Sequence, residues 1–115
     1  MEHKLYDLSK LHEIAQGNEA FVEDMLISFV ENVSLDIEQI QSLHDQKNWK
    51  TIAEISHRLA SRYAYLIIDN LQYLSSDIEK SVFECNFTGI CDKTERLCNE
   101  TILLIERMKK DFNFL

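Results

Sequence analysis

Apolar residues recur at steps of three and four along most of this chain, which is the spacing of α-helices with one buried side. The clearest example is the stretch 51–66, where one stripe predicts a core helix. Similar stripes predict helices over residues 8–16, 19–45 and 90–111, and another helix from residue 69 to a break at Thr88 and Gly89. The stripe of the stretch 51–66 consists of Ile52, Ile55, Leu59, Tyr63 and Leu66.

The polar residues between these stripes predict short connections. Asn18 and Asn48 stand directly before two of the helices, where an asparagine side chain can accept a hydrogen bond from a free backbone N–H. The chain has no proline and only two glycines, whereas a β-rich chain of this size needs many turn residues. Short links make successive helices antiparallel neighbours. We therefore expect an all-α fold: an up-and-down antiparallel four-helix bundle with a short additional N-terminal helix.

Length and charge narrow the possible functions. The 115 residues suffice for one domain, 1–115, with one core. The formal net charge of −8 repels phosphate backbones and anionic lipid, so we expect no nucleic-acid and no membrane partner. No apolar run is long enough to span a bilayer and the N-terminus does not resemble a secretory signal, which predicts a cytoplasmic protein. Three cysteines without a Cys-x-x-Cys pair favour neither disulfides nor a metal site.

One histidine stands out by its position on the helical wheel. His57 points nearly opposite the apolar stripe of its helix, so we expect its imidazole to face water. A single exposed histidine usually has no special role, but its neighbours on the helix surface are small where a solvated face would carry Lys, Glu or Gln. These neighbours are Ala53, Ala60, Ser61 and Ala64.

A protruding imidazole on a flat surface predicts a docking site with chemistry, because a neutral imidazole is a good nucleophile near pH 7. Lys50 lies seven residues before His57, on nearly the same face, and gives this surface a positive rim. Arg58 and Arg62 lie to one side and are long enough to swing toward a group on the imidazole.

The run of residues 53–61, followed by Leu71 and then by residues 77–79 (Asp-Ile-Glu), resembles the histidine-containing phosphotransfer (HPt) domain family, in helix order as well as at the motif. The usual family pattern is Ala-His-x-Leu-Lys-Gly, and His57 and Leu59 match it directly. Ser, Ala and Ser stand at positions 56, 60 and 61, where the family usually has Ala, Lys and Gly.

The resemblance implies that His57 accepts a phosphoryl group from a receiver-domain aspartate and passes it to another receiver in a multistep two-component phosphorelay. Implied partners are response-regulator receiver domains or a hybrid sensor histidine kinase, and the Mg²⁺ ion belongs to the receiver, so the chain itself binds no cofactor. We expect the imidazole nitrogen farther from the backbone to attack. Arg58 and Arg62 are the available substitutes for the family lysine that Ala60 replaces.

Other functions fit the sequence less well. The chain has no Gly-rich phosphate loop, no Ser/His/Asp arrangement and no Glu-x-x-His pair, so no kinase activity of its own is expected. The alternative to a phosphocarrier is a non-catalytic helical interaction bundle, either a degenerate HPt domain or an unrelated adaptor. An adaptor would bind its partner equally well with His57 replaced, whereas a phosphocarrier needs that residue.

Overall fold

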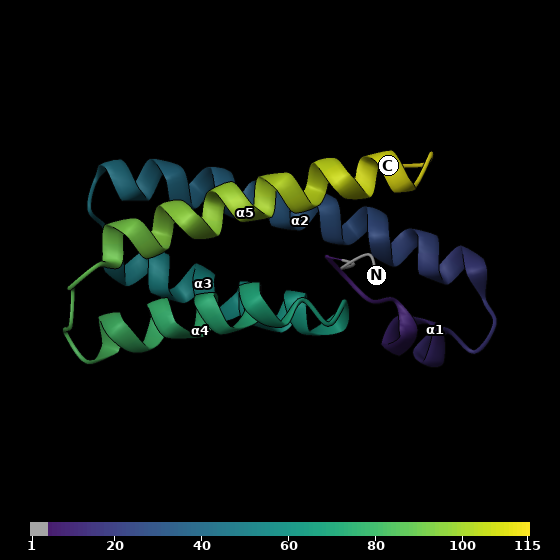
Figure 1. The fold of residues 1–115 in the computed structure, drawn as a ribbon, viewed down its shortest axis with the longest axis horizontal. Coiled ribbons are helices and arrows are strands. Elements are labelled where there is room, and N and C mark those ends of the chain that lie inside the picture. Colours follow the sequence, from purple (N-terminus) through teal and green to yellow (C-terminus); the bar gives the residue numbers. More distant parts are fainter. Residues whose placement is uncertain (1–4) are drawn as a thin grey trace.

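The computed structural model describes residues 5–115, and within that range the secondary structure is entirely helical (Figure 1). The described residues form five helices, in the order the apolar stripes predict. These helices are α1 (Ser9–Ala15), α2 (Glu19–Asp45), α3 (Trp49–Tyr65), α4 (Asp69–Phe83) and α5 (Ile90–Asp111).

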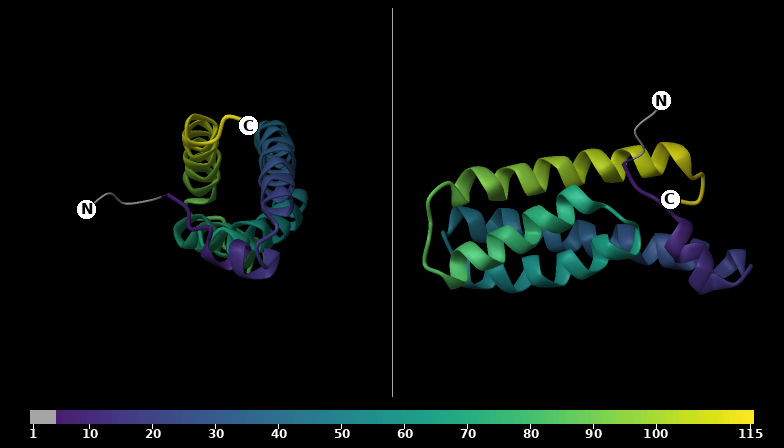
Figure 2. Two further views of the ribbon diagram at one scale, coloured as in Figure 1. Left: turned by 90° about the vertical axis from the view of Figure 1, so that its right-hand side faces the viewer. Right: turned by 60° about the horizontal axis from the view of Figure 1, so that its bottom comes forward.

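The four longer helices pack against one another. Each of α2, α3 and α4 packs against the next helix in the chain, and α5 also packs against α2, so the contacts close into a ring. Figure 2 shows this ring along its axis, with α5 and α2 on one side and α3 and α4 on the other. The short helix α1 packs against α2 at the end where α2 extends beyond α3 and α4 (Figure 1).

The predicted stripes form the core. All five stripe residues of α3 are at most 4% exposed, and the corresponding positions of α2, α4 and α5 meet them inside the ring. One minor expectation is wrong: the steps of three that predict a helix over residues 8–16 run through Leu8, Leu11 and Ile14, but Ile14 is about half exposed. The short α1 buries only Leu11 and Ala15, because it contacts the bundle along one edge.

The two asparagine caps are confirmed. The side chain of Asn18 accepts a hydrogen bond from the backbone N–H of Phe21, and that of Asn48 accepts one from the N–H of Thr51. Each satisfies one of the free N–H groups of a helix start. No such cap begins α4, where Asp69 is already the first helical residue.

Four helices are followed by a residue with left-handed backbone geometry that is not a glycine. These residues have φ angles of 50–55° and follow α1, α2, α3 and α4, in the order Gln16, Lys47, Ile67 and Cys85. After α4, the N–H of Asn86 donates to the carbonyl of Ser81 at 2.8 Å, and the N–H of Cys85 donates to that of Val82. This double hydrogen bond closes the helix at its C-terminus. As a result α4 ends at Phe83, several residues before the break expected at Thr88 and Gly89.

In the part of the chain that the structure describes, every helix is too short or too polar to cross a lipid bilayer.

Candidate functional site

His57 lies in the middle of α3 with its side chain 72% exposed. Its Nδ1 atom lies 2.7 Å from Oε2 of Glu79, a residue of the neighbouring helix α4 that is 40% exposed. The imidazole is therefore held at its inner nitrogen, while the rest of the ring faces solvent. A fixed ring orientation distinguishes His57 from an ordinary surface histidine, whose side chain samples several rotamers.

The contact with Glu79 determines which nitrogen of His57 is available for chemistry. A carboxylate can only accept hydrogen bonds, so an approach of 2.7 Å places a proton on Nδ1. In the neutral imidazole the other nitrogen, Nε2, then has no proton and carries a free lone pair. The geometry gives His57 an outward-facing nucleophilic atom.

Small side chains are close to His57 on α3. Ser56 is fully buried, and Ala53, Ala60 and Ala64 are half-buried. The α3–α4 contact is the most extensive between any two helices here. Three of the residues expected to form a docking floor are thus partly covered rather than fully open to solvent.

The remaining residues of the predicted docking surface are open to solvent. Lys50 and Ser61 are exposed on α3, one on each side of His57 along the helix axis. At 1.5 Å per residue, Lys50 lies about 10 Å from His57 along the axis and Ser61 about 6 Å.

Arg58 and Arg62 contact a different helix from the one His57 contacts. A guanidinium nitrogen of Arg58 donates to Oδ1 of Asp36 on α2 at 2.6 Å, and Nε of Arg62 lies 3.4 Å from the other carboxylate oxygen. Asp36 is only 5% exposed, and its hydrogen bond raises the pKa of Arg58. The arginines fix α3 against α2, about 100–140° around α3 from His57. Their assistance to a phosphoryl group stays a prediction.

A second ion pair fixes the helix that carries Glu79. Lys93 on α5 places its ammonium 2.9 Å from Asp77 and 3.4 Å from the hydroxyl of Ser81, both on α4. Asp77 precedes Glu79 by two residues and so points to a different side of α4. With α5 holding one side of α4, the other side presents Glu79 to α3.

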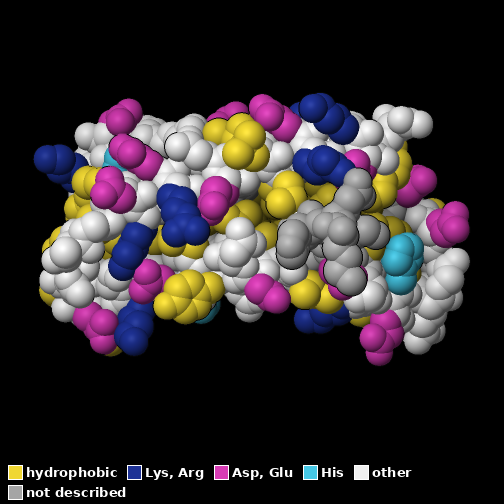
Figure 3. All heavy atoms as spheres, in the orientation of Figure 1, with side chains coloured by type: hydrophobic (Ala, Val, Ile, Leu, Met, Phe, Trp, Pro, Cys, Tyr) yellow, Lys and Arg dark blue, Asp and Glu magenta, His cyan; other side chains and the backbone are white. Residues whose placement is uncertain are grey.

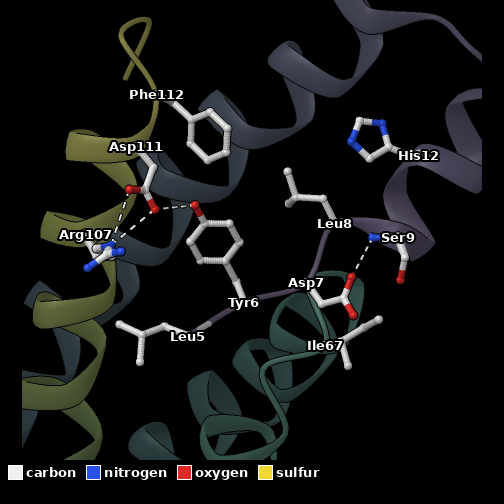
Figure 4. A pocket seen from close by; sticks show the side chains of 10 residues that line it. All are labelled: Leu5, Tyr6, Asp7, Leu8, Ser9, His12, Ile67, Arg107, Asp111 and Phe112. Carbon is white, nitrogen blue, oxygen red and sulfur yellow. Dashed lines mark hydrogen bonds and ion pairs between the residues drawn. The ribbon is translucent and has the colours of Figure 1, made fainter. Parts of the chain in front are cut away.

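A cavity of about 870 Å³ lies elsewhere, between the N-terminal segment, α1 and the end of α5 (Figure 4). There Asp111 accepts a hydrogen bond from the Tyr6 hydroxyl at 2.5 Å and also contacts Arg107. Desolvation and this carboxylate raise the pKa of Tyr6 to about 12. None of the residues that line this cavity belongs to the functional site predicted from the sequence.

Within residues 5–115, no three His, Cys, Asp or Glu side chains gather in a way that could hold a metal ion. The three cysteines are free thiols: Cys85 and Cys91 are exposed, and Cys98 is buried. On the face shown in Figure 3, basic side chains are interspersed with acidic ones rather than gathered into one basic surface.

The sequence did not reveal what Glu79 does. It belongs to the run 77–79 that carries part of the family resemblance, but its contact with His57 depends on how α4 packs against α3. No spacing within one helix encodes a contact between residues 22 positions apart.

The structure therefore defines an all-helical protein with an exposed, oriented histidine on one face. Comparison with curated proteins finds partial similarity to the virulence sensor protein BvgS of Bordetella bronchiseptica, with 32% identity over 47 residues. The same identity holds for the BvgS proteins of Bordetella pertussis and Bordetella parapertussis. The aligned region covers 41% of this chain but only 4% of these relatives. No family model matches the chain, and no solved structure matches it significantly.

Proposed function

We propose that this chain is a histidine phosphotransfer domain, which accepts a phosphoryl group on His57 from the aspartate of one receiver domain and passes it to another. The observation that carries the proposal is the 2.7 Å contact between Nδ1 of His57 and Glu79, which leaves Nε2 as an exposed nucleophile. The partial similarity to a sensor protein supports a role in signalling. The partners are receiver domains, free or within a hybrid sensor kinase, and the site of action is the cytoplasm.

In the proposed transfer, the proton on Nδ1 of His57 leaves Nε2 as the atom that attacks. The lone pair of Nε2 attacks the phosphorus of the receiver's aspartyl phosphate, and an N–P bond forms while the bond from phosphorus to the aspartate oxygen breaks. The aspartate leaves with the bonding electrons as a carboxylate. Donation of the lone pair makes the imidazole ring positive while Nδ1 keeps its proton. The Glu79 carboxylate beside Nδ1 stabilises this developing charge and holds the ring in line.

The bundle itself contributes position rather than catalytic groups. The receiver supplies the activated phosphate and the Mg²⁺ ion that neutralises its oxygens. The finer architecture in this proposal is an up-and-down antiparallel four-helix bundle of α2 to α5 with α1 added at one end. The closed ring of helix contacts supports it.

The deciding experiment uses receiver domains charged with labelled acetyl phosphate and mixed with this chain. We expect label on His57 only, stable to base and labile to acid, as a phosphoramidate is. His57→Gln should abolish labelling and change the free energy of unfolding by no more than about 0.5 kcal/mol, since the side chain faces solvent. His12→Gln, which alters an exposed histidine on α1, is the matched control and should be labelled like the parent.

The same assay separates the phosphocarrier from the adaptor. If the parent binds a receiver but takes no label, and His57→Gln binds equally well, the chain is an interaction bundle. The departures from the family pattern at Ser56, Ala60 and Ser61 are the observation that favours this second possibility.

A further inference from the structure

Phe83 is the last residue of α4 and is 88% exposed, more than any other large hydrophobic side chain that the structure describes. It lies four residues after Glu79, so it follows one helical turn later on nearly the same side of α4. A phenylalanine side chain buries roughly 150–250 Å² of surface when it packs against a partner, and this burial is favourable. An exposed phenylalanine gains none of that free energy. An exposed aromatic beside the candidate site therefore requires an explanation.

The size of a protein interface gives that explanation. A standard interface covers about 800 Å² on each partner, which corresponds to a disc of roughly 16 Å radius. In a transfer complex His57 must lie near the centre of this disc, because its nitrogen meets the reacting phosphorus. Glu79 touches the imidazole, and Phe83 is about 6 Å further along α4. Phe83 consequently lies inside the footprint of any partner that reaches His57.

The surroundings of Phe83 favour an apolar contact. α3 and α4 are antiparallel and His57 lies beside Glu79, so Phe83, four residues after Glu79, lies at about the height of Ala53, four residues before His57. The short side chain of Ala53 leaves the phenyl ring open to an approaching surface. Aromatic residues near the centre of an interface, in places from which water is excluded, supply much of the binding energy. The phosphoryl chemistry at His57 is polar and contributes little apolar area by itself.

We propose that Phe83 is the apolar anchor of the docking surface and packs against an apolar part of the receiver domain that binds at His57. This inference rests on the proposed function, because it assigns Phe83 to the partner of the same site. Phe83 acts on binding and does not touch the reacting atoms. Its loss should weaken capture of the phosphorylated receiver without altering the transfer step.

The test measures single-turnover transfer to this chain over a range of concentrations of a receiver charged with acetyl phosphate. The receiver is the fastest-reacting one from a panel. We expect Phe83→Ala to raise the concentration for half-maximal rate about tenfold or more, with the maximal rate within about twofold of the parent. Phe83→Leu should recover part of the loss, because it restores apolar area.

Tyr73→Ala is the matched control. Tyr73 is a 74% exposed aromatic on the same helix, but it lies about 120° around α4 from Glu79, and Phe83 only about 40°. The control should behave like the parent, and thermal melting should show all variants folded. A Phe83→Ala variant with the parent's half-saturation concentration overturns the inference while the proposed function stands. A parent chain that takes no label from any receiver overturns both.

Discussion

His57 on α3 and Glu79 on α4 meet at 2.7 Å across a helix interface, and this contact leaves Nε2 of the histidine facing solvent with its lone pair free. A charged partner on the inner nitrogen orients the ring, and in the proposed phosphoryl transfer it would favour the positive charge on the imidazole.

The first prediction concerns this carboxylate. Glu79→Ala should slow transfer to His57 about tenfold, because a hydrogen bond to a charged group contributes about 1.5–3 kcal/mol and the 40% exposure of Glu79 argues for the lower end. Glu79→Gln, which keeps an oxygen acceptor but no charge, should lie between Ala and the parent. The measurement is the maximal single-turnover rate. Glu54→Ala, at an exposed acid on α3, is the control, and equal rates for all four proteins would show that Glu79 has no role.

The docking surface gives a second prediction. Ser61→Trp places a bulky side chain on the exposed face next to His57 and should block transfer without unfolding the bundle. Leu59→Ala, at a fully buried position two residues earlier, should instead lower the free energy of unfolding by roughly 2–5 kcal/mol. Urea denaturation and the transfer assay separate the two effects. Unchanged transfer in the Ser61→Trp protein would mean that the receiver docks on another face.

A third prediction follows from the buried position of Asp36. Asp36→Ala removes the acceptor that Arg58 and Arg62 share, and it should destabilise the fold by about 1–3 kcal/mol. Both arginines keep access to water, so the loss should not reach the larger cost of stranding a fully buried charge. Glu38→Ala, at an exposed acid on the same helix, should change stability by less than about 0.5 kcal/mol. Equal urea midpoints for the two variants would contradict a structural role for Asp36.

The arginines also carry a kinetic prediction. Arg58 is half exposed and adjacent to His57, so its guanidinium has the shorter reach to a phosphoryl group, although it must give up its 2.6 Å hydrogen bond to Asp36. We expect Arg58→Ala to slow transfer more than Arg62→Ala, and Ala60→Lys to restore part of the rate. Parent rates in both arginine variants would indicate that the receiver provides all the positive charge.

The fifth prediction concerns alkaline pH. Burial, with a smaller contribution from Glu95, raises the pKa of the Cys98 thiol from 9.0 to about 11. The folded state therefore favours the neutral thiol, so this stabilisation is complete below pH 9 and is lost as pH rises toward 11. Urea unfolding between pH 8 and 11 should show a steeper loss in the parent than in Cys98→Ala. At pH 8 a thiol reagent should modify Cys85 and Cys91 quickly and Cys98 only on unfolding, whereas three equally fast thiols would contradict this assignment.

The sequence by itself determined the helices, most of the core and the outward direction of His57. These features depend on local periodicity, since a residue opposite an apolar stripe faces water whichever helices cover that stripe. The asparagine caps at Asn18 and Asn48 were predictable for the same reason, because a cap acts on the N–H groups of its own first turn.

Only the tertiary structure decided what the side chains beside His57 do. The partner of the imidazole is 22 residues away, and the arginines turn toward Asp36 on α2, because the packing of α3 against α4 and α2 sets which side chains meet. The left-handed residues Ile67 and Cys85 were equally hidden. Their side chains disfavour that geometry, and it is held by the hydrogen bonds that close α3 and α4.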